Sequence, residues 1–284
     1  MDKIYLKAKA KINLTLNVLD KRPDNYHNIE SVFQKISLYD ELIIEKNNSN
    51  KFNLECNLKE LETDSNILFK AYKKLKEQFP NISGINVKLI KHIPMQAGLG
   101  GGSSDCASFL IGVNTLFNLN LSQVDINNIG KDLGADVVPC MYKLVKSEGI
   151  GDIVTELKSN LKYYILVVKP DFKCDTKKMY EKLDSSQNLK QEFNTNEVIN
   201  ILKSDNIKKF KNKLYNVFEY AIDEQDTLNN LKNDFINTGA IATLLSGSGS
   251  CIYGIYSNKS EINSAYNFLK NKYNYKFYRC ISCN

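Results

Sequence analysis

The residues best suited to chemistry in this 284-residue chain lie in one glycine-rich stretch, Pro94-Met95-Gln96-Ala97-Gly98-Leu99-Gly100-Gly101-Gly102-Ser103-Ser104. An alternating apolar pattern typical of a strand precedes it, and the apolar spacing of an amphipathic helix follows it. Glycines let the backbone approach a ligand closely, and the free N–H groups at a helix N-terminus favour anions. The stretch is neither a P-loop nor a dinucleotide fingerprint. It therefore predicts phosphate binding, with a glycine turn that binds nothing as the plain alternative.

Three further places carry polar side chains that could take part in a reaction. Lys11 and Asn13 share one face of the alternating strand that opens the chain. Tyr26 and His27 lie in a turn and combine a stacking plane with a ring that can donate or accept a hydrogen bond. Asp136 follows a helix end among small and apolar residues, where a carboxylate becomes catalytic only with a partner. From the residues alone, a solvated strand face, a loop anchor and an ordinary turn residue remain the alternatives.

The composition indicates an ordinary globular protein, with 43% hydrophobic and 25% charged residues. No apolar run approaches the ~20 residues that a membrane span needs. The first residues also lack the basic and apolar regions of a secretion signal, so we expect a cytoplasmic enzyme. The formal net charge of +6 comes from lysines spread along the whole chain, which argues against a nucleic-acid-binding face.

The cysteines give no sign of a metal centre. There are seven, scattered along the chain, and thiols in a cytoplasmic protein are mostly reduced. Only Cys280 and Cys283 have the spacing of zinc ligands, whereas a zinc site needs further ligands and both histidines, His27 and His92, are isolated. We expect a metal-free, frayed C-terminal end.

The strand and helix patterns alternate along the chain and predict an α+β protein with two lobes that divide near residues 150–160. In the first half we expect strands at 4–19 and 85–89, paired strands within 32–44 around a turn at 38–40, a hairpin tip at 46–51, and helices after caps at 63–65, at 103–105 and at Ser122, the last with Val124, Ile126 and Ile129 facing inward. In the second half we expect a central strand at 163–168, helices at 176–183, within 192–237 and at 260–272, a second glycine turn at 244–251, and strands at 252–256 and 276–281.

Three separated segments together resemble the GHMP kinases, the superfamily that phosphorylates galactose, homoserine, mevalonate and phosphomevalonate. They are Lys11-Ile12-Asn13-Leu14, the glycine-rich stretch, and Leu245-Ser246-Gly247-Ser248-Gly249. The resemblance implies a two-lobed GHMP kinase fold. Residues 1–156 would form an ATP-binding lobe similar to domain 2 of ribosomal protein S5, and residues 157–284 a ferredoxin-like lobe.

Further matches are closest to the branch of this superfamily that acts in the non-mevalonate (MEP) pathway of isoprenoid biosynthesis. They are Asp24-Asn25-Tyr26-His27, Gly134-Ala135-Asp136-Val137 and Glu148-Gly149-Ile150-Gly151. This branch transfers phosphate from ATP, with Mg, to the 2-hydroxyl of cytidine diphosphate methylerythritol. Asn25 stands where the branch usually has Gly, and Asn tolerates a left-handed backbone better than most residues.

The resemblance also assigns roles to residues. Lys11 and Asp136 would be the catalytic pair, with the carboxylate as base and the ammonium neutralising charge on the transferred group. The whole run from Pro94 to Ser104 would bind ATP, and Ser104 is a candidate magnesium contact. Four residues would bind the substrate: Asn13 near the reaction centre, Tyr26 and Tyr180 around the cytosine, and His27 by hydrogen bonding.

Two other functions stay open at this point. Val138 stands beside Asp136 where the branch usually has Pro, so a GHMP kinase acting on another alcohol is one alternative. A non-catalytic nucleotide- or RNA-binding protein with an S5-like lobe is the other, prompted by the positive charge. The expected partners are a small-molecule substrate and neither nucleic acid nor membrane, and the expected assembly is a monomer or weak homodimer.

Overall fold

The computed structural model describes residues 1–186, 194–204 and 206–283. Its contacts group into two compact units that do not follow each other along the chain. The first unit consists of Met1–Ala10, Leu38–Met95 and Gly100–Met141, and the second of Lys11–Ser37, Gln96–Leu99 and Tyr142–Asn284. The two long strands β1 (Lys3–Lys21) and β2 (His27–Asn47) contribute residues to both units. The boundary expected between residues 156 and 157 stays a prediction.

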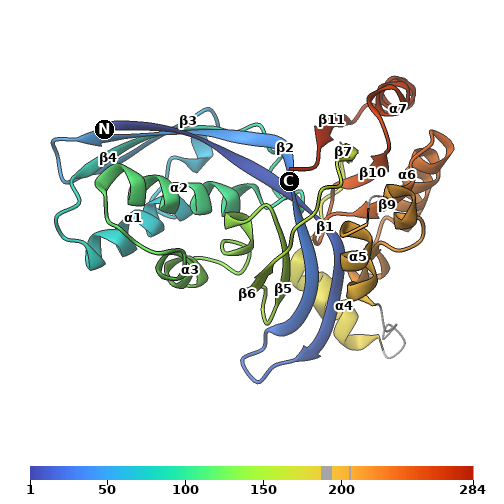
Figure 1. Ribbon diagram of the computed structural model, residues 1–284, viewed down its shortest axis with the longest axis horizontal. Helices are drawn as coiled ribbons and strands as arrows, with labels where there is room; N and C mark the ends of the chain where they lie inside the picture. The colour runs from blue at the N-terminus through green and yellow to red at the C-terminus, as the bar shows by residue number, and fades with distance from the viewer. Residues whose placement is uncertain (187–193, 205, 284) are drawn as a thin grey trace. The chain divides into compact units, whose positions relative to one another are not determined.

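The first unit is a sheet with its helices on one side (Figure 1). The strand β4 pairs antiparallel with β2 and parallel with β3. Apolar side chains of the sheet and the helices form one buried core, which includes Leu42, Ile85 and Phe109. The elements of this unit, besides its parts of β1 and β2, are η1 (Lys59–Leu61), α1 (Ile67–Gln78), α2 (Gly101–Phe117), α3 (Gln123–Lys131), η2 (Pro139–Met141), β3 (Phe52–Cys56) and β4 (Gly84–Ile90).

The turn expected at residues 38–40 is wrong, because β2 runs without interruption from His27 to Asn47. Asp40 is completely buried, and its carboxylate accepts the backbone N–H groups of His92 and Ile93. A polar residue that satisfies distant backbone groups inside the core looks like a turn residue in the sequence. The hairpin tip expected at 46–51 is also wrong, since β3 pairs with β4.

The helix starts were predicted to within a few residues. α1 begins after Asn66, whose side chain accepts the N–H of Leu68, and not after residues 63–65. Ser122 caps α3, as expected, and it does so through a reciprocal capping box with Asp125. Val124 was expected to face inward but is 66% exposed, whereas Ile126 and Ile129 are buried.

The second unit contains the rest of β1 and β2 and a separate antiparallel sheet in the order β11-β7-β10-β9. Helices α6 and α7 pack their apolar residues on this sheet, with Phe235 and Leu269 beside Leu166 and Ile252. Four antiparallel strands covered by helices agree with the expected ferredoxin-like lobe. The elements of this unit are β5 (Leu144–Glu148), β6 (Ile153–Glu156), β7 (Tyr164–Lys169), α4 (Thr176–Ser185), α5 (Thr195–Leu202), η3 (Ile207–Phe210), β8 (Tyr215–Asn216), η4 (Val217–Tyr220), α6 (Gln225–Asn237), β9 (Ala242–Leu245), β10 (Ile252–Tyr256), α7 (Lys259–Lys272) and β11 (Lys276–Ile281).

The C-terminal end is not frayed, contrary to expectation. The strand β11 pairs along its length with β7, and Cys280 in it is buried. Beyond the strand, the backbone N–H of Cys283 donates to the carbonyl of Lys35. Cys280 therefore lies within a paired strand, and Cys283 is hydrogen-bonded to β2 just beyond that strand. Among the described residues, no helix is both long enough and apolar enough to span a membrane.

Candidate active site

Lys11 lies in the middle of β1 and is 4% exposed, which excludes the interpretation as a solvated strand face. Its Nζ donates to Asn13 Oδ1 at 2.7 Å and lies 4.7 Å from the ring centroid of Phe33. The neighbours Ile12 and Leu14 are buried as well, so β1 is covered on both faces here. An ammonium placed in such surroundings keeps its direction, because an amide oxygen and an aromatic face restrict it.

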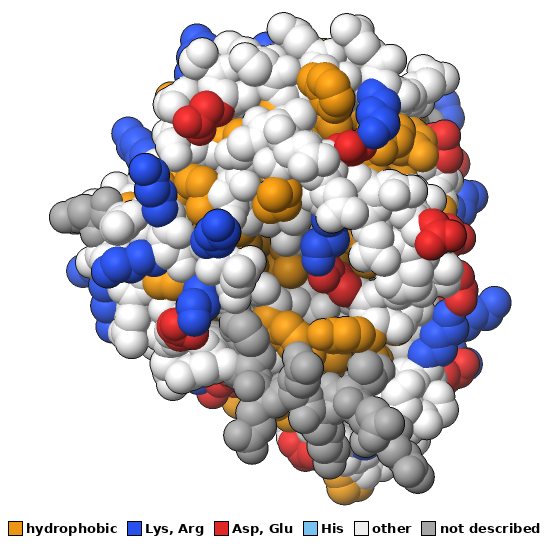
Figure 2. Space-filling model, turned by 90° about the vertical axis from the view of Figure 1, so that its right-hand side faces the viewer, with side chains coloured by type: hydrophobic (Ala, Val, Ile, Leu, Met, Phe, Trp, Pro, Cys, Tyr) orange, Lys and Arg blue, Asp and Glu red, His pale blue; other side chains and the backbone are white. Residues whose placement is uncertain are grey.

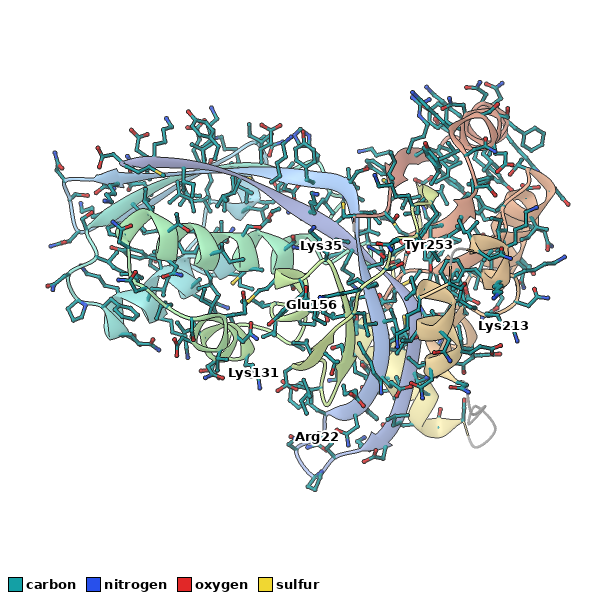
Figure 3. All side chains as sticks on the ribbon, viewed as in Figure 1. Arg22, Lys35, Lys131, Glu156, Lys213 and Tyr253 are labelled. Carbon is teal, nitrogen blue, oxygen red and sulfur yellow. The ribbon has the colours of Figure 1, made fainter. Side chains whose placement is uncertain are left out.

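Asn13 is the centre of a buried hydrogen-bond network within the second unit. Its Nδ2 donates to Ser31 Oγ at 2.8 Å, and its Oδ1 accepts the backbone N–H of Gly247 at 3.0 Å in addition to Lys11. The hydroxyl of Tyr253, labelled in Figure 3, donates to the Asn13 carbonyl at 2.7 Å. The side-chain rotamer of Asn13 is therefore fixed on both its oxygen and its nitrogen.

The second glycine turn, Ser246–Ser250, packs directly against residues 96–99 of the glycine-rich stretch. Ser246 Oγ donates to the Gly98 carbonyl at 3.0 Å, and the N–H of Cys251 donates to the Ala97 carbonyl at 3.2 Å. Gly98 has a φ of +74°, and a Cβ there would lie 1.8 Å from the Ser246 carbonyl oxygen. The N–H of Lys11 donates to the Leu99 carbonyl at 3.0 Å, so β1 joins the same assembly.

Residues 100–104 of the stretch form the start of α2 in the first unit. Gly100 has a φ of +66° as the N-cap residue, and no side chain caps this helix end. A Cβ at Gly102 would meet no atom within 4 Å. An uncapped helix N-terminus with open space beside a glycine is suited to a phosphate group. Pro94 and Met95, the first two residues of the stretch, belong to the same unit.

The buried ion trio Asp40–Lys91–Asp105 supports this helix start and was missed in the sequence. Lys91 Nζ lies 2.6 Å from an Asp105 carboxylate oxygen and forms a second ion pair with Asp40. Asp105 thus turns toward Lys91 in the core. Burial would lower the pKa of Lys91, but the two carboxylates outweigh it and raise that pKa. Burial, and then repulsion from Asp40, raise the pKa of Asp105 to about 8 against the attraction of Lys91.

Asp136 lies in the turn between α3 and η2, in the first unit. Its backbone carbonyl accepts the N–H of Cys140 at 3.2 Å, and the next two residues, Val137 and Val138, are completely buried. The local position is the partly dry one that the sequence suggested. The pairing of Asp136 with Lys11 stays a prediction, because the two residues belong to different units.

The predicted base-binding residues gather near the turn between β1 and β2. Tyr26 is 61% exposed, and His27 begins β2. The rings of His27 and Tyr180 are stacked, with centroids 4.8 Å apart and an angle of 16° between their planes. Asp184 in α4, which was missed in the sequence, is hydrogen-bonded to His27 Nε2 at 2.6 Å and ion-paired with Lys21. These bonds, the one with Lys21 first, lower the pKa of Asp184.

The left-handed conformation expected of Asn25 is present, with a φ of +65°. It closes the turn beside Arg22, which Figure 3 labels at the end of the β1–β2 hairpin. Asn25 N–H donates to the Arg22 carbonyl at 3.1 Å, and the Arg22 N–H donates to the Tyr26 carbonyl at 2.8 Å. Tyr26 is therefore presented by a turn of defined geometry.

No metal-binding cluster of side chains occurs among the described residues. They contain no group of three or more His, Cys, Asp or Glu side chains that could hold an ion. The Ser104 hydroxyl is buried and donates to the Lys9 carbonyl at 2.6 Å, so it is already engaged with the backbone. The assignment of Ser104 to magnesium stays a prediction.

A glycine-rich loop leading into an uncapped helix, with a buried lysine held beside part of that loop, defines the class of small-molecule kinases to which the sequence resemblance pointed. Residues 66–143 match the family model described as GHMP kinases N terminal domain, and residues 200–275 match GHMP kinases C terminal. The chain belongs to the GHMP kinase family, which confirms the predicted family, fold class and enzyme class.

Relatives across nearly the full length share one name, 4-diphosphocytidyl-2-C-methyl-D-erythritol kinase. The protein of Caldicellulosiruptor saccharolyticus is 39% identical over 94% of this chain and 93% of its own. That of Acetivibrio thermocellus is 37% identical over 95% and 96% of the two chains. The same fold occurs in a crystal structure of 4-(cytidine 5'-diphospho)-2C-methyl-D-erythritol kinase, with a TM-score of 0.83, 22% identity and coverage of 99% and 100%. It also occurs in homoserine kinase from Cytophaga hutchinsonii, with a TM-score of 0.74, 14% identity and coverage of 100% and 95%.

Proposed function

We propose that the protein transfers the terminal phosphoryl group of ATP to the 2-hydroxyl of 4-diphosphocytidyl-2-C-methyl-D-erythritol, a step of isoprenoid precursor synthesis in the cytoplasm. The shared name of relatives at 34–39% identity supports this substrate over another alcohol. The observation that carries the chemistry is the buried Lys11 ammonium, held by Asn13 and joined through its backbone to residue 99 of the glycine-rich stretch.

The roles follow from what phosphoryl transfer requires, which is positioning and stabilisation of negative charge. The N-terminus of α2 and the backbone of residues 94–104 bind the ATP phosphates. Lys11 neutralises charge on the transferred group, and Asp136 accepts the proton of the substrate hydroxyl. Magnesium would arrive with the nucleotide, as it does where substrate phosphates supply its ligands, and no described residue is assigned to it.

The base of the substrate binds at the β1–β2 turn in this proposal. Tyr26 is exposed and can stack on a ring, and the Tyr180 ring stacks on His27 nearby. Asp184 holds His27 Nε2, which leaves the Nδ1 side of the ring for the base.

A coupled assay of ATP consumption against a panel of alcohols tests the function. Turnover is expected with 4-diphosphocytidyl-2-C-methyl-D-erythritol and not with homoserine or mevalonate. Turnover of another alcohol alone would overturn the substrate and keep the kinase. ATP-independent, steeply salt-dependent RNA binding would instead support the non-catalytic alternative. The face drawn in Figure 2 gives that alternative no specific support, because Asp and Glu side chains lie among its Lys and Arg side chains.

Asp136→Asn tests the catalytic base. We expect kcat to fall by roughly 10²- to 10⁴-fold, the usual contribution of a positioned base, while ATP binding measured by calorimetry stays nearly unchanged. Asp132→Asn is the matched control, because Asp132 is an exposed residue of the same turn region whose ion pair with Lys74 contributes little. Near-normal turnover of Asp136→Asn would remove the base from the mechanism.

A further inference from the structure

Asn216 is a buried residue of the second unit with no role in the sequence resemblance. It ends the short strand β8, which pairs parallel with β1 at Thr15 and Leu16, and it is 1% exposed. Its Nδ2 donates to the Leu245 carbonyl at 2.9 Å and to the Gly247 carbonyl at 2.8 Å. One amide group thus holds the second glycine turn at two points.

The other atom of this amide and a neighbouring carboxylate complete the support. Asn216 Oδ1 accepts the N–H of Phe218 at 3.0 Å, which caps η4. Glu219 in η4 accepts the N–H of Leu245 at 2.8 Å through Oε1 and pairs with Lys232 through Oε2. The entry into the second glycine turn is therefore fixed by a capped helix and its side chains.

The second glycine turn also holds the side chain of Asn13. Gly247 has a φ of +56°, and its carbonyl accepts from Asn216 while its N–H donates to Asn13 Oδ1. That same Oδ1 accepts from Lys11 Nζ. A continuous series of hydrogen bonds therefore runs from Asn216 through Gly247 and Asn13 to the Lys11 ammonium.

We propose that Asn216 is a positioning residue for phosphoryl transfer, which fixes the second glycine turn so that Asn13 aims Lys11. This inference rests on the proposed function, in which Lys11 stabilises charge on the transferred group. Amides suit the task, because they restrict an ammonium without cancelling its charge. A displacement of about 1 Å at a reacting group is enough to lower a rate by roughly 10²-fold.

Asn216→Asp tests the proposal, because it separates two roles of the side chain: capping η4 and donating to the carbonyls of the second glycine turn. The aspartate keeps an oxygen for the Phe218 N–H, and Asp is as good a cap as Asn. It replaces the Nδ2 donor by an oxygen that faces two carbonyl oxygens, so the second glycine turn is released. We expect kcat to fall roughly 10- to 100-fold, with the KM for ATP changed by less than about threefold.

Asn206→Asp is the matched control. Asn206 caps η3 in the same way, with its side chain accepting the N–H of Lys208, but it is exposed and holds no glycine turn. We expect this variant to retain the activity of the unmodified protein. If the unmodified protein and this control both lack kinase activity, the proposed function is wrong. Loss of activity in Asn216→Asp alone concerns the role of Asn216.

A double-mutant cycle with Asn13→Ala distinguishes positioning from general support of the fold. If Asn216 acts through Asn13, Asn216→Asp should lower kcat by no more than about twofold in the Asn13→Ala background. Independent, multiplying losses in the two variants would overturn the proposal, as would an unchanged kcat in Asn216→Asp. Should Asn216→Asp show no cooperative thermal unfolding, Asn216→Ser replaces it, since Ser caps a helix without adding charge and is too short to reach both carbonyls.

Discussion

Two buried polar networks hold two parts of the glycine-rich stretch, and they differ in charge. In the first unit, the ion trio Asp40–Lys91–Asp105 fixes the start of α2. In the second unit, the amides of Asn13 and Asn216 fix the turn against residues 96–99. The trio is built from ionisable groups, whereas the bonds that hold the second glycine turn at Gly247 join neutral groups.

The difference follows from what each network supports. The trio ties three elements of one core together, since Asp40 comes from β2, Lys91 follows β4 and Asp105 belongs to α2. Buried charges of this kind are costly to separate, so they specify one arrangement. The amide network instead restricts the direction of the Lys11 ammonium, which is catalytic in the proposed function. We infer that ionisable groups fix the elements of the core in the first unit, whereas neutral amides fix the second glycine turn in the second unit.

Lys91→Met should produce the largest change of stability. It leaves two carboxylates buried without their cation, which lowers the free energy of unfolding by about 3–5 kcal/mol. Thermal and urea unfolding measure the loss. Lys88→Met in β4, the strand that precedes Lys91, is the control, because the Lys88–Glu55 pair is exposed and contributes less than about 1 kcal/mol. Equal losses in the two variants would show that the trio has no special role.

Gly98→Ala and Gly102→Ala each add one methyl group, and their effects on stability compare the two parts of the glycine-rich stretch. At Gly98 the added Cβ collides with the Ser246 carbonyl and the positive φ is strained, so we expect a loss of about 3 kcal/mol in stability. At Gly102 the added Cβ contacts no other atom, so the free energy of unfolding, measured by thermal denaturation, should change by less than about 1 kcal/mol.

The KM of the Gly102→Ala variant for ATP tests whether Gly102 lies in the nucleotide site. The new methyl group occupies space beside the N-terminus of α2, so the KM for ATP should rise by roughly tenfold. An unchanged KM would remove Gly102 from the nucleotide site, and a destabilised Gly102→Ala variant would show that the open space is filled.

The sequence predicts most of the elements because their signals are local. Alternation placed β1 and β4, a continuous apolar run placed β7, and the spacing of apolar residues placed α7. The helix cap at Ser122 was predicted from the same kind of local signal. Each of these signals is complete within a few residues of the chain.

The supports of the site could not be predicted in this way, because their partners lie far apart in the sequence. Asp40 and Lys91 are separated by 51 residues and Asn216 and Gly247 by 31. Asp40 looked like a turn residue, and Asp105 looked like part of a helix start. Only the packing of β2, β4 and α2 brings both carboxyl groups to one lysine in the core. The glycine run at 246–249 was visible, but its contact with Gly98 was not.

The smallest expected difference between the two networks is in how the free energy of unfolding depends on pH. The pKa of Asp105 is raised from 3.8 to about 8 in the folded protein, so the folded state binds more protons than the unfolded state between these values. The free energy of unfolding therefore falls as the pH rises from about 4 to about 8, because ionised Asp105 is disfavoured in the core. Asp105→Asn removes this dependence.

Melting temperatures measured from pH 5 to pH 9 should thus shift in favour of Asp105→Asn as the pH rises, by a few degrees in total. Ser31→Ala supplies the comparison from the neutral network, since it removes the partner of Asn13 Nδ2 and no titrating group. Its difference from the unmodified protein should stay constant over the same range. A constant difference for Asp105→Asn as well would mean that Asp105 stays ionised beside Lys91 throughout, and that the first network differs from the second in strength and not in its response to protons.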